Sequence, residues 1–395
     1  MKRAEFASLR RRQNRSAVLH LIRTEGPIAP SRIAHHLSMS LPTLSRVVEQ
    51  LSAEDLIHVR ERKSGRGRRR SVLEFKGTAH AVVGIDLGGT KMYGTVADLN
   101  GTILHQVYQP WEDNGGPAHA LDSLYALIEQ LLAMPRPAGQ RILGIGVGAP
   151  GVTLSDEGIV IWAPGLGWRE LPLKTLLSDR FKLPVFIEND VNLAALGEFG
   201  FGAARGTPNM VSMAIGTGIG AGIIIEGRLY RGHHQGAGEV GYLLPGIEFL
   251  GRRYDGFGAL EGLAAGNGIA SRAGALLAQQ AHPLAQENLT AEDIFNYARQ
   301  GQGWAQQIVD ETVDYLSHAI ACISALLDPE VIVLGGGVAR SADLLVEPIR
   351  RRINGAVPFV PDIVASKLGP RAVIMGAIML VLEEPLQQPV ADRRP

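Results

Sequence analysis

The sequence predicts an α/β protein in two parts: a small basic domain of helices with a hairpin, and a larger body made of two similar halves. Charge is the first indication, because residues 1–80 hold 17 Lys and Arg against 7 Asp and Glu, whereas residues 81–395 hold 22 against 32. The second is a pattern of strand, glycine-rich loop and hairpin that occurs twice in the body. A basic end on an otherwise acidic chain is typical of a segment that binds nucleic acid.

Three short helices are expected in the basic segment, because its apolar residues recur at helical spacing over residues 14–24, 31–37 and 41–53. Ser40 is the expected N-cap of the third helix, since its hydroxyl can accept a bond from the first free N–H groups. Pro42 suits the first turn of that helix, where a missing N–H costs nothing.

Two short strands, 56–59 and 71–75, flank an arginine-rich run and complete the plan of a winged helix-turn-helix. The third helix of such a domain enters the major groove, and arginines of the wing meet phosphates or a narrow minor groove. DNA is therefore the expected partner, and the alternative is a small helical domain that binds protein. The expected DNA-binding residues are Thr43, Ser45, Arg46, Arg66, Arg68, Arg69 and Arg70.

The body contains glycine clusters at the ends of apolar strands, where backbone N–H groups can cradle a phosphate. Strand 81–86 ends at Asp86, which would hold Mg²⁺ through water, and a second strand at 92–98 leads to the two-residue hairpin signal Asn100-Gly101. The pattern recurs with strand 211–215, a loop over 216–220 and a hairpin. A third cluster follows strand 331–334. The candidate phosphate- and nucleotide-binding residues are Asp86, Gly88, Gly89, Thr90, Lys91, Gly216, Thr217, Gly218, Gly335, Gly336 and Gly337.

The composition limits the class of protein. Cys322 is the only cysteine of the chain, which excludes an internal disulfide and a cysteine-rich metal site. No run of about 18 apolar residues and no signal-peptide pattern is found, so we expect a cytoplasmic protein without a membrane partner.

Taken together, the motifs DLGGTK, GAPG, IEND and IGTGIGAGIIIEGRLYRGHHQGAGEVG resemble those of the ROK family, which unites sugar-responsive repressors with sugar kinases. The resemblance covers nearly the whole chain and implies a two-lobed actin-like (ribonuclease H-like) sugar-kinase fold with ligand between the lobes. A winged helix is a feature of the repressor branch. The expected domains are residues 1–78 for the head, 79–190 for the first lobe and 191–395 for the second. The last helix can return to the first lobe, and the tail after 385 is expected to be disordered.

The resemblance also implies a sugar site formed by Asn189, Asp190, Glu239, Tyr242 and Glu261. Asp190 matches the family's catalytic base, which takes the proton from the attacking hydroxyl in the kinases. Two departures are visible. The positions of the family's structural zinc ligands, one His and three Cys, hold Tyr242, Arg252, Tyr254 and Ala259, so no metal is expected. Gly165 stands where the family commonly has a sugar-binding Asn.

The sequence is consistent with three functions. The leading one is a transcriptional repressor that binds an operator as a homodimer or higher oligomer and responds to a sugar or sugar phosphate, with no cofactor required for repression. The second is a sugar kinase that uses ATP and Mg²⁺ and carries a regulatory head. The third is an interaction protein whose body docks another component, although no residue argues for it.

Overall fold

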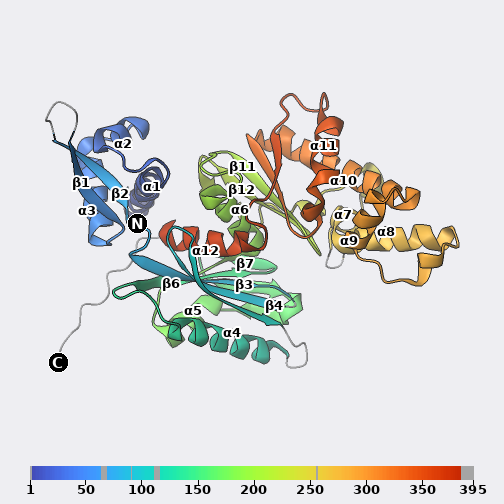
Figure 1. The fold of residues 1–395 in the computed structure, drawn as a ribbon, viewed down its shortest axis with the longest axis horizontal. Helices are drawn as coiled ribbons and strands as arrows, with labels where there is room; N and C mark the ends of the chain where they lie inside the picture. The colour runs from blue at the N-terminus through green and yellow to red at the C-terminus, as the bar shows by residue number, and fades with distance from the viewer. Residues whose placement is uncertain (1, 64–68, 90, 111–115, 255–256, 384–395) are drawn as a thin grey trace. The chain divides into compact units, whose positions relative to one another are not determined.

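A computed structural model describes residues 2–63, 69–89, 91–110, 116–254 and 257–383 (Figure 1). Contacts between Cα atoms divide the chain into two units. The first unit comprises residues 1–188 with 377–395, and the second comprises residues 189–376. The expected disordered tail after 385 lies outside the described residues.

The head is a winged helix-turn-helix, as the sequence predicted. Its elements are α1 (Lys2–Glu25), α2 (Pro30–His36), α3 (Leu41–Ala53), β1 (Ile57–Lys63) and β2 (Arg69–Phe75). Strands β1 and β2 pair antiparallel, and Ile28 adds a single bridge to Leu73. Helix α1 begins twelve residues before the expected start at Asn14. The polar, Arg-rich stretch at its N-terminal end has no apolar stripe that periodicity could detect.

The first unit also contains a five-stranded sheet in the order β10-β6-β3-β4-β5. These strands are β3 (His80–Leu87), β4 (Lys91–Asp98), β5 (Ile103–Pro110), β6 (Arg141–Ala149) and β10 (Val185–Asn189). Helices α4 (Gly116–Ala133) and α5 (Leu173–Phe181) cover one face, and the C-terminal part of α12 (Ala372–Glu383) lies on the other (Figure 1). A small sheet of β7 (Val152–Leu154), β8 (Ile159–Ala163) and β9 (Trp168–Leu171) leads into α5.

The second unit repeats this sheet in the order β15-β14-β11-β12-β13. These strands are β11 (Met210–Ile215), β12 (Ile219–Ile225), β13 (Arg228–Leu229), β14 (Val331–Gly335) and β15 (Asp362–Ala365). In each five-stranded sheet the central strand, β3 or β11, pairs antiparallel with the next strand of the chain and parallel with a strand that follows later. The two similar halves predicted from the repeated glycine pattern are therefore confirmed.

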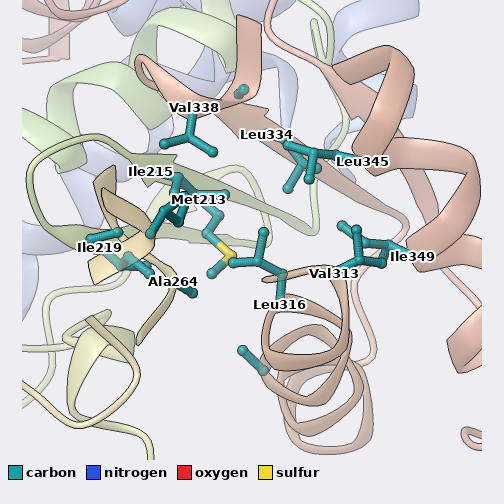
Figure 2. Packing of buried hydrophobic residues seen from close by; sticks show 14 of the residues in the cluster. Met213, Ile215, Ile219, Ala264, Val313, Leu316, Leu334, Val338, Leu345 and Ile349 are labelled. Atoms are coloured by element: carbon teal, nitrogen blue, oxygen red, sulfur yellow. The ribbon is translucent and has the colours of Figure 1, made fainter. Parts of the chain in front are cut away.

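Helices cover both faces of the second sheet. Helix α6 (Asp190–Phe201) packs on one face, and the other carries α7 (Glu261–Ala264), α8 (Gly266–Gln279), α9 (Ala291–Arg299), α10 (Gly303–Leu327) and α11 (Ala342–Ile353). Figure 2 shows Met213 and Leu334 of the sheet meeting Leu316 of α10 and Ile349 of α11 in a buried apolar core. This core holds the strand ends, and therefore the glycine loops, in fixed positions.

Two hairpins differ from the expected ones. Asp98 ends β4 and its carboxylate accepts bonds from the backbone N–H groups of Asn100 (3.0 Å) and Thr102 (2.8 Å), so the connection is wider than the two residues expected. The second glycine loop is narrower than the expected 216–220, because Ile219 already pairs with Ile215 in the ladder. Hydrogen bonds to the Asp98 side chain thus set the length of the first connection, and strand pairing sets the length of the second.

Candidate functional site

The third helix of the head presents a polar face to solvent. Leu44, Val47 and Leu51 are buried on its inner face, while Ser45 and Arg46 are exposed on the outer face. Ser40 is the N-cap as expected: its hydroxyl accepts the backbone N–H of Thr43 and also bonds the Thr43 hydroxyl at 2.8 Å. The Ser45 hydroxyl donates to Glu49 at 3.2 Å. The start of α3 is therefore preformed, with short polar side chains at the end that such helices direct to DNA.

The wing is described only in part. Arg69 and Arg70 begin β2, opposite Lys63 and Arg62 in the ladder, and only their backbone is described. Arg66 and Arg68, at the tip of the expected wing, lie outside the described residues.

The first phosphate loop is a tight turn between β3 and β4. Gly88 donates its N–H to the carbonyl of Lys91 at 2.8 Å, and Asp86 precedes this turn near the end of β3. Burial raises the pKa of Asp86 to about 6, against the lowering effect of Lys91. A partly buried carboxylate whose charge is this costly fits a cation ligand. Thr90 lies outside the described residues.

Gly165, one of the two departures from the family pattern, lies beside this loop. A Cβ atom at Gly165 would come within 3.2 Å of the Cα atom of Gly89. A side chain at this position would therefore press on the turn, which gives the glycine a packing reason of its own.

The other two glycine loops lie together at the end of β11. Gly216 donates to the carbonyl of Gly218 at 2.9 Å, and its own carbonyl accepts the N–H of Gly266 at 2.7 Å at the start of α8. Gly336 has a φ of 84°, and a Cβ atom there would overlap the backbone of Ile215. Both loops therefore expose backbone close to one strand end, as a nucleotide-binding surface requires.

The expected sugar residues all belong to the second unit. Asn189 is the N-cap of α6: its Oδ1 accepts the N–H groups of Val191 at 2.9 Å and Asn192 at 3.1 Å. Asp190 is the first residue of that helix. The side chain of Val191 lies close to Gly220 in β12, so the start of α6 adjoins the start of β12. The helix start thus presents an amide and a carboxylate in a capped, rigid geometry.

The other three expected sugar residues lie close together near the start of β12: Glu239, Tyr242 and Glu261. The Oε2 atom of Glu261 accepts the N–H of Ile219, the first residue of β12, at 2.9 Å. Partial burial raises the pKa of Glu261, which the Ile219 bond partly offsets. Glu239 is exposed at its surface, and desolvation of its carboxylate together with the charge of Glu261 raises its pKa. Burial and both carboxylates also raise the pKa of the half-exposed Tyr242 hydroxyl.

One of the family's zinc positions, Arg252, makes contacts of another kind. Arg252 donates to the carbonyl of Glu248 at 3.0 Å and lies over the Phe249 ring. Over the described ranges, no group of three or more His, Cys, Asp or Glu could hold a metal ion. Likewise, none of the described helices is both long and apolar enough to span a membrane.

Known proteins match both parts of the chain. The ROK family model matches residues 82–384, and the MarR family model matches residues 13–66. The xylose repressor of Caldicellulosiruptor bescii is 28% identical over 386 residues, covering 95% of this chain and 97% of that protein. The glucokinase of Halalkalibacterium halodurans is 34% identical over 313 residues, covering 76% of this chain and 95% of that protein. A solved ROK family transcriptional regulator, a homolog of the E. coli MLC protein, aligns with a TM-score of 0.79 at 26% identity, covering 95% and 97%.

Proposed function

This chain belongs to the ROK family, and from that premise we propose that it is a sugar-responsive repressor: the head binds operator DNA, and a sugar bound to the body releases it. The observation that carries the proposal is the winged helix joined to the ROK body. The glucokinase relative matches only 76% of the chain, whereas the xylose repressor matches 95%, head included. Because the match to the xylose repressor includes the head, DNA binding is favoured as the main role.

The proposed mode of DNA binding follows from α3. Thr43, Ser45 and Arg46 would contact base edges in the major groove, since they lie at the start and on the outer face of that helix. The wing arginines (Arg66, Arg68, Arg69 and Arg70) would contact phosphates or the minor groove. Because an operator of this kind is read by two heads related by two-fold symmetry, the active species is a homodimer or a larger assembly, acting in the cytoplasm.

The proposed sugar site comprises Asn189, Asp190, Glu239, Tyr242 and Glu261. Carboxylates accept hydrogen bonds from sugar hydroxyls, and the mutual charge of Glu239 and Glu261 supports an uncharged ligand. A sugar phosphate would bring a further negative charge to this acidic group. We therefore favour an unphosphorylated sugar as the effector. The proposed domains span 1–78, 79–190 and 191–395, with the C-terminal helix returning toward the first lobe. Asn189 and Asp190 end the second of these domains, and Glu239, Tyr242 and Glu261 lie in the third.

A second function, sugar phosphorylation, is favoured by one observation: the residue types that it needs are all present in the sequence. Asp190 would accept the proton of the attacking hydroxyl. Asp86 would hold Mg²⁺ through water, and the glycine loops would hold the phosphates of ATP. Bound ATP and Mg²⁺ would supply the phosphoryl group and neutralise its charge. Repression itself needs neither of them.

Parallel assays separate the two functions. Purified protein is titrated against DNA from upstream of its own gene at fixed salt, with D-xylose and D-glucose, and the same samples are tested for ATP-dependent phosphorylation of these sugars. A repressor gives specific DNA binding that one sugar weakens. Asp190→Asn abolishes any phosphorylation and spares DNA binding without sugar. DNA binding that depends on salt alone, with active phosphorylation, would instead establish the kinase.

A further inference from the structure

Arg15 is a buried arginine in α1, with 1% of its surface exposed. Its Nε atom donates to the carboxylate of Glu54 at 3.1 Å, and its Nη2 atom donates to the same carboxylate. Its Nη1 atom donates to the carbonyl oxygen of Leu382 at 2.7 Å, 367 positions away in the sequence. One guanidinium therefore connects the head to the C-terminal helix of the body.

Both partners of Arg15 lie at helix ends. Glu54 is the C-cap residue of α3, the helix proposed to read DNA. Leu382 is the penultimate residue of α12, and the last four carbonyls of a helix have no partner within the helix. The negative pole of the helix dipole at this end also stabilises the positively charged guanidinium. Because the guanidinium is planar with donors in fixed directions, it sets the end of α12 and the end of α3 in one geometry.

The start of α12 packs against α6, the helix whose first residues are proposed to bind sugar. A Cβ atom on Gly376 would overlap the backbone of Leu193 in α6, and one on Gly197 of α6 would overlap the backbone of Ala372. The two helices therefore touch backbone to backbone without room for a side chain. Helix α6 begins at Asp190, directly after its cap Asn189. A displacement at the start of α6 is thus passed to the start of α12 by direct contact.

Helix α12 runs from the second unit into the first, because the division falls between Gly376 and Ala377. Ala377 packs tightly against Gly146 in β6. Arg23, two turns after Arg15 in α1, contacts the sulfur of Met379 at 2.7 Å. The same short helix therefore contacts the sugar-binding helix at its start and the head along its end.

We propose that α12 is the element that reports sugar binding to the DNA-binding helix, and that Arg15 is the positioning residue at which the signal enters the head. This inference rests on the proposed repressor function. A sugar can change DNA affinity only if it binds the two arrangements of the protein differently. The Arg15–Glu54–Leu382 contact gives α3 a defined position in one arrangement, and a shift of α12 would alter it.

The test is a double variant, Arg15→Met with Glu54→Gln. It removes the contact with α12 and avoids leaving a buried charge unpaired, because a buried carboxylate without its arginine would destabilise the head. The matched control is Arg32→Met with Glu25→Gln, which removes an exposed Arg–Glu pair (3.1 Å) from the same head. For each protein the dissociation constant for upstream DNA is measured without and with saturating D-xylose or D-glucose, and sugar affinity is measured by calorimetry.

We expect sugar to weaken DNA binding of the wild type and the control by about 5–150-fold, the usual range of such coupling. In the Arg15 variant the ratio should fall to near one, while sugar affinity remains that of the wild type. A variant that keeps both sugar affinity and the full ratio would overturn the proposal. Absence of any sugar effect in the wild type would overturn the repressor function itself, and the inference with it.

Hydrogen exchange on the wild type provides a second readout that does not depend on the variant folding. Sugar should change exchange in peptides covering residues 189–201, and also in those covering 377–383 and 14–25. A change confined to residues 189–201 would contradict transmission through α12.

Discussion

The ionised carboxylate of Asp86 is expected to lower the free energy of unfolding of the protein at neutral pH. Its carboxylate lies near the end of β3, and burial raises its pKa to about 6. A raised pKa means that the folded protein binds a proton more readily than the unfolded chain does, so ionisation of this group opposes folding at neutral pH. Asp86→Asn removes that charge and keeps the shape. We therefore predict that this variant is more stable than the wild type above pH 6.

The magnitude follows from the shift. The pKa rises from 3.8 to about 6, and each unit corresponds to 1.36 kcal/mol, so ionisation costs ~3 kcal/mol of folding free energy at pH 7.5. Below pH 3.8 both states are protonated and the cost vanishes, and at pH 4.5 it is ~1 kcal/mol. The stability gain of Asp86→Asn should therefore grow by ~2 kcal/mol between pH 4.5 and pH 7.5.

Urea unfolding of both proteins at the two pH values measures this difference. Asp122→Asn, at an exposed position of α4, controls for removal of one carboxylate. A gain that is equal at pH 4.5 and pH 7.5, or no gain at pH 7.5, would show that the charge of Asp86 does not oppose folding. Such a result would mean that the first phosphate loop carries no costly charge and has no particular need of a cation.

Three further predictions concern other parts of the molecule. Ser40→Ala removes the cap of α3 and should destabilise the head by ~1 kcal/mol in thermal unfolding, with weaker DNA binding; unchanged stability would contradict the capping role. Sugar affinity, measured by calorimetry, should be full above the raised pKa values of Glu239 and Glu261 and should fall as the pH drops through them. The variant Glu261→Gln should bind sugar more weakly, and its affinity should depend less on pH. Gly376→Ala should destabilise the fold by ~1–3 kcal/mol through overlap with α6. Its control, Gly274→Ala in α8, has open space and should be neutral or stabilising by up to ~1 kcal/mol.

The sequence predicted those features that depend on local signals. Ser40 and Pro42 marked the start of α3, and both stand where a helix start requires them. The repeated glycine clusters predicted two similar halves, because a strand that ends in a phosphate loop needs glycine at a fixed place in each half.

Contacts between distant segments could not be predicted in this way. Nothing near Arg15 distinguishes it from the other arginines of α1, and its importance appears only when Leu382 is brought beside it. The grouping of Glu239 and Glu261 is similar: their assignment as sugar residues depended on resemblance to a family. Desolvation and mutual repulsion, which raise the pKa of Glu239, arise only in the folded chain.

Coupling between sugar and DNA is measured by the affinity for sugar with and without saturating upstream DNA. Salt must be held fixed, because DNA binding depends steeply on it. If sugar weakens DNA binding by a given factor, DNA must weaken sugar binding by the same factor. We expect this reciprocal loss of sugar affinity. Sugar affinity that is unchanged by bound DNA would exclude the coupling.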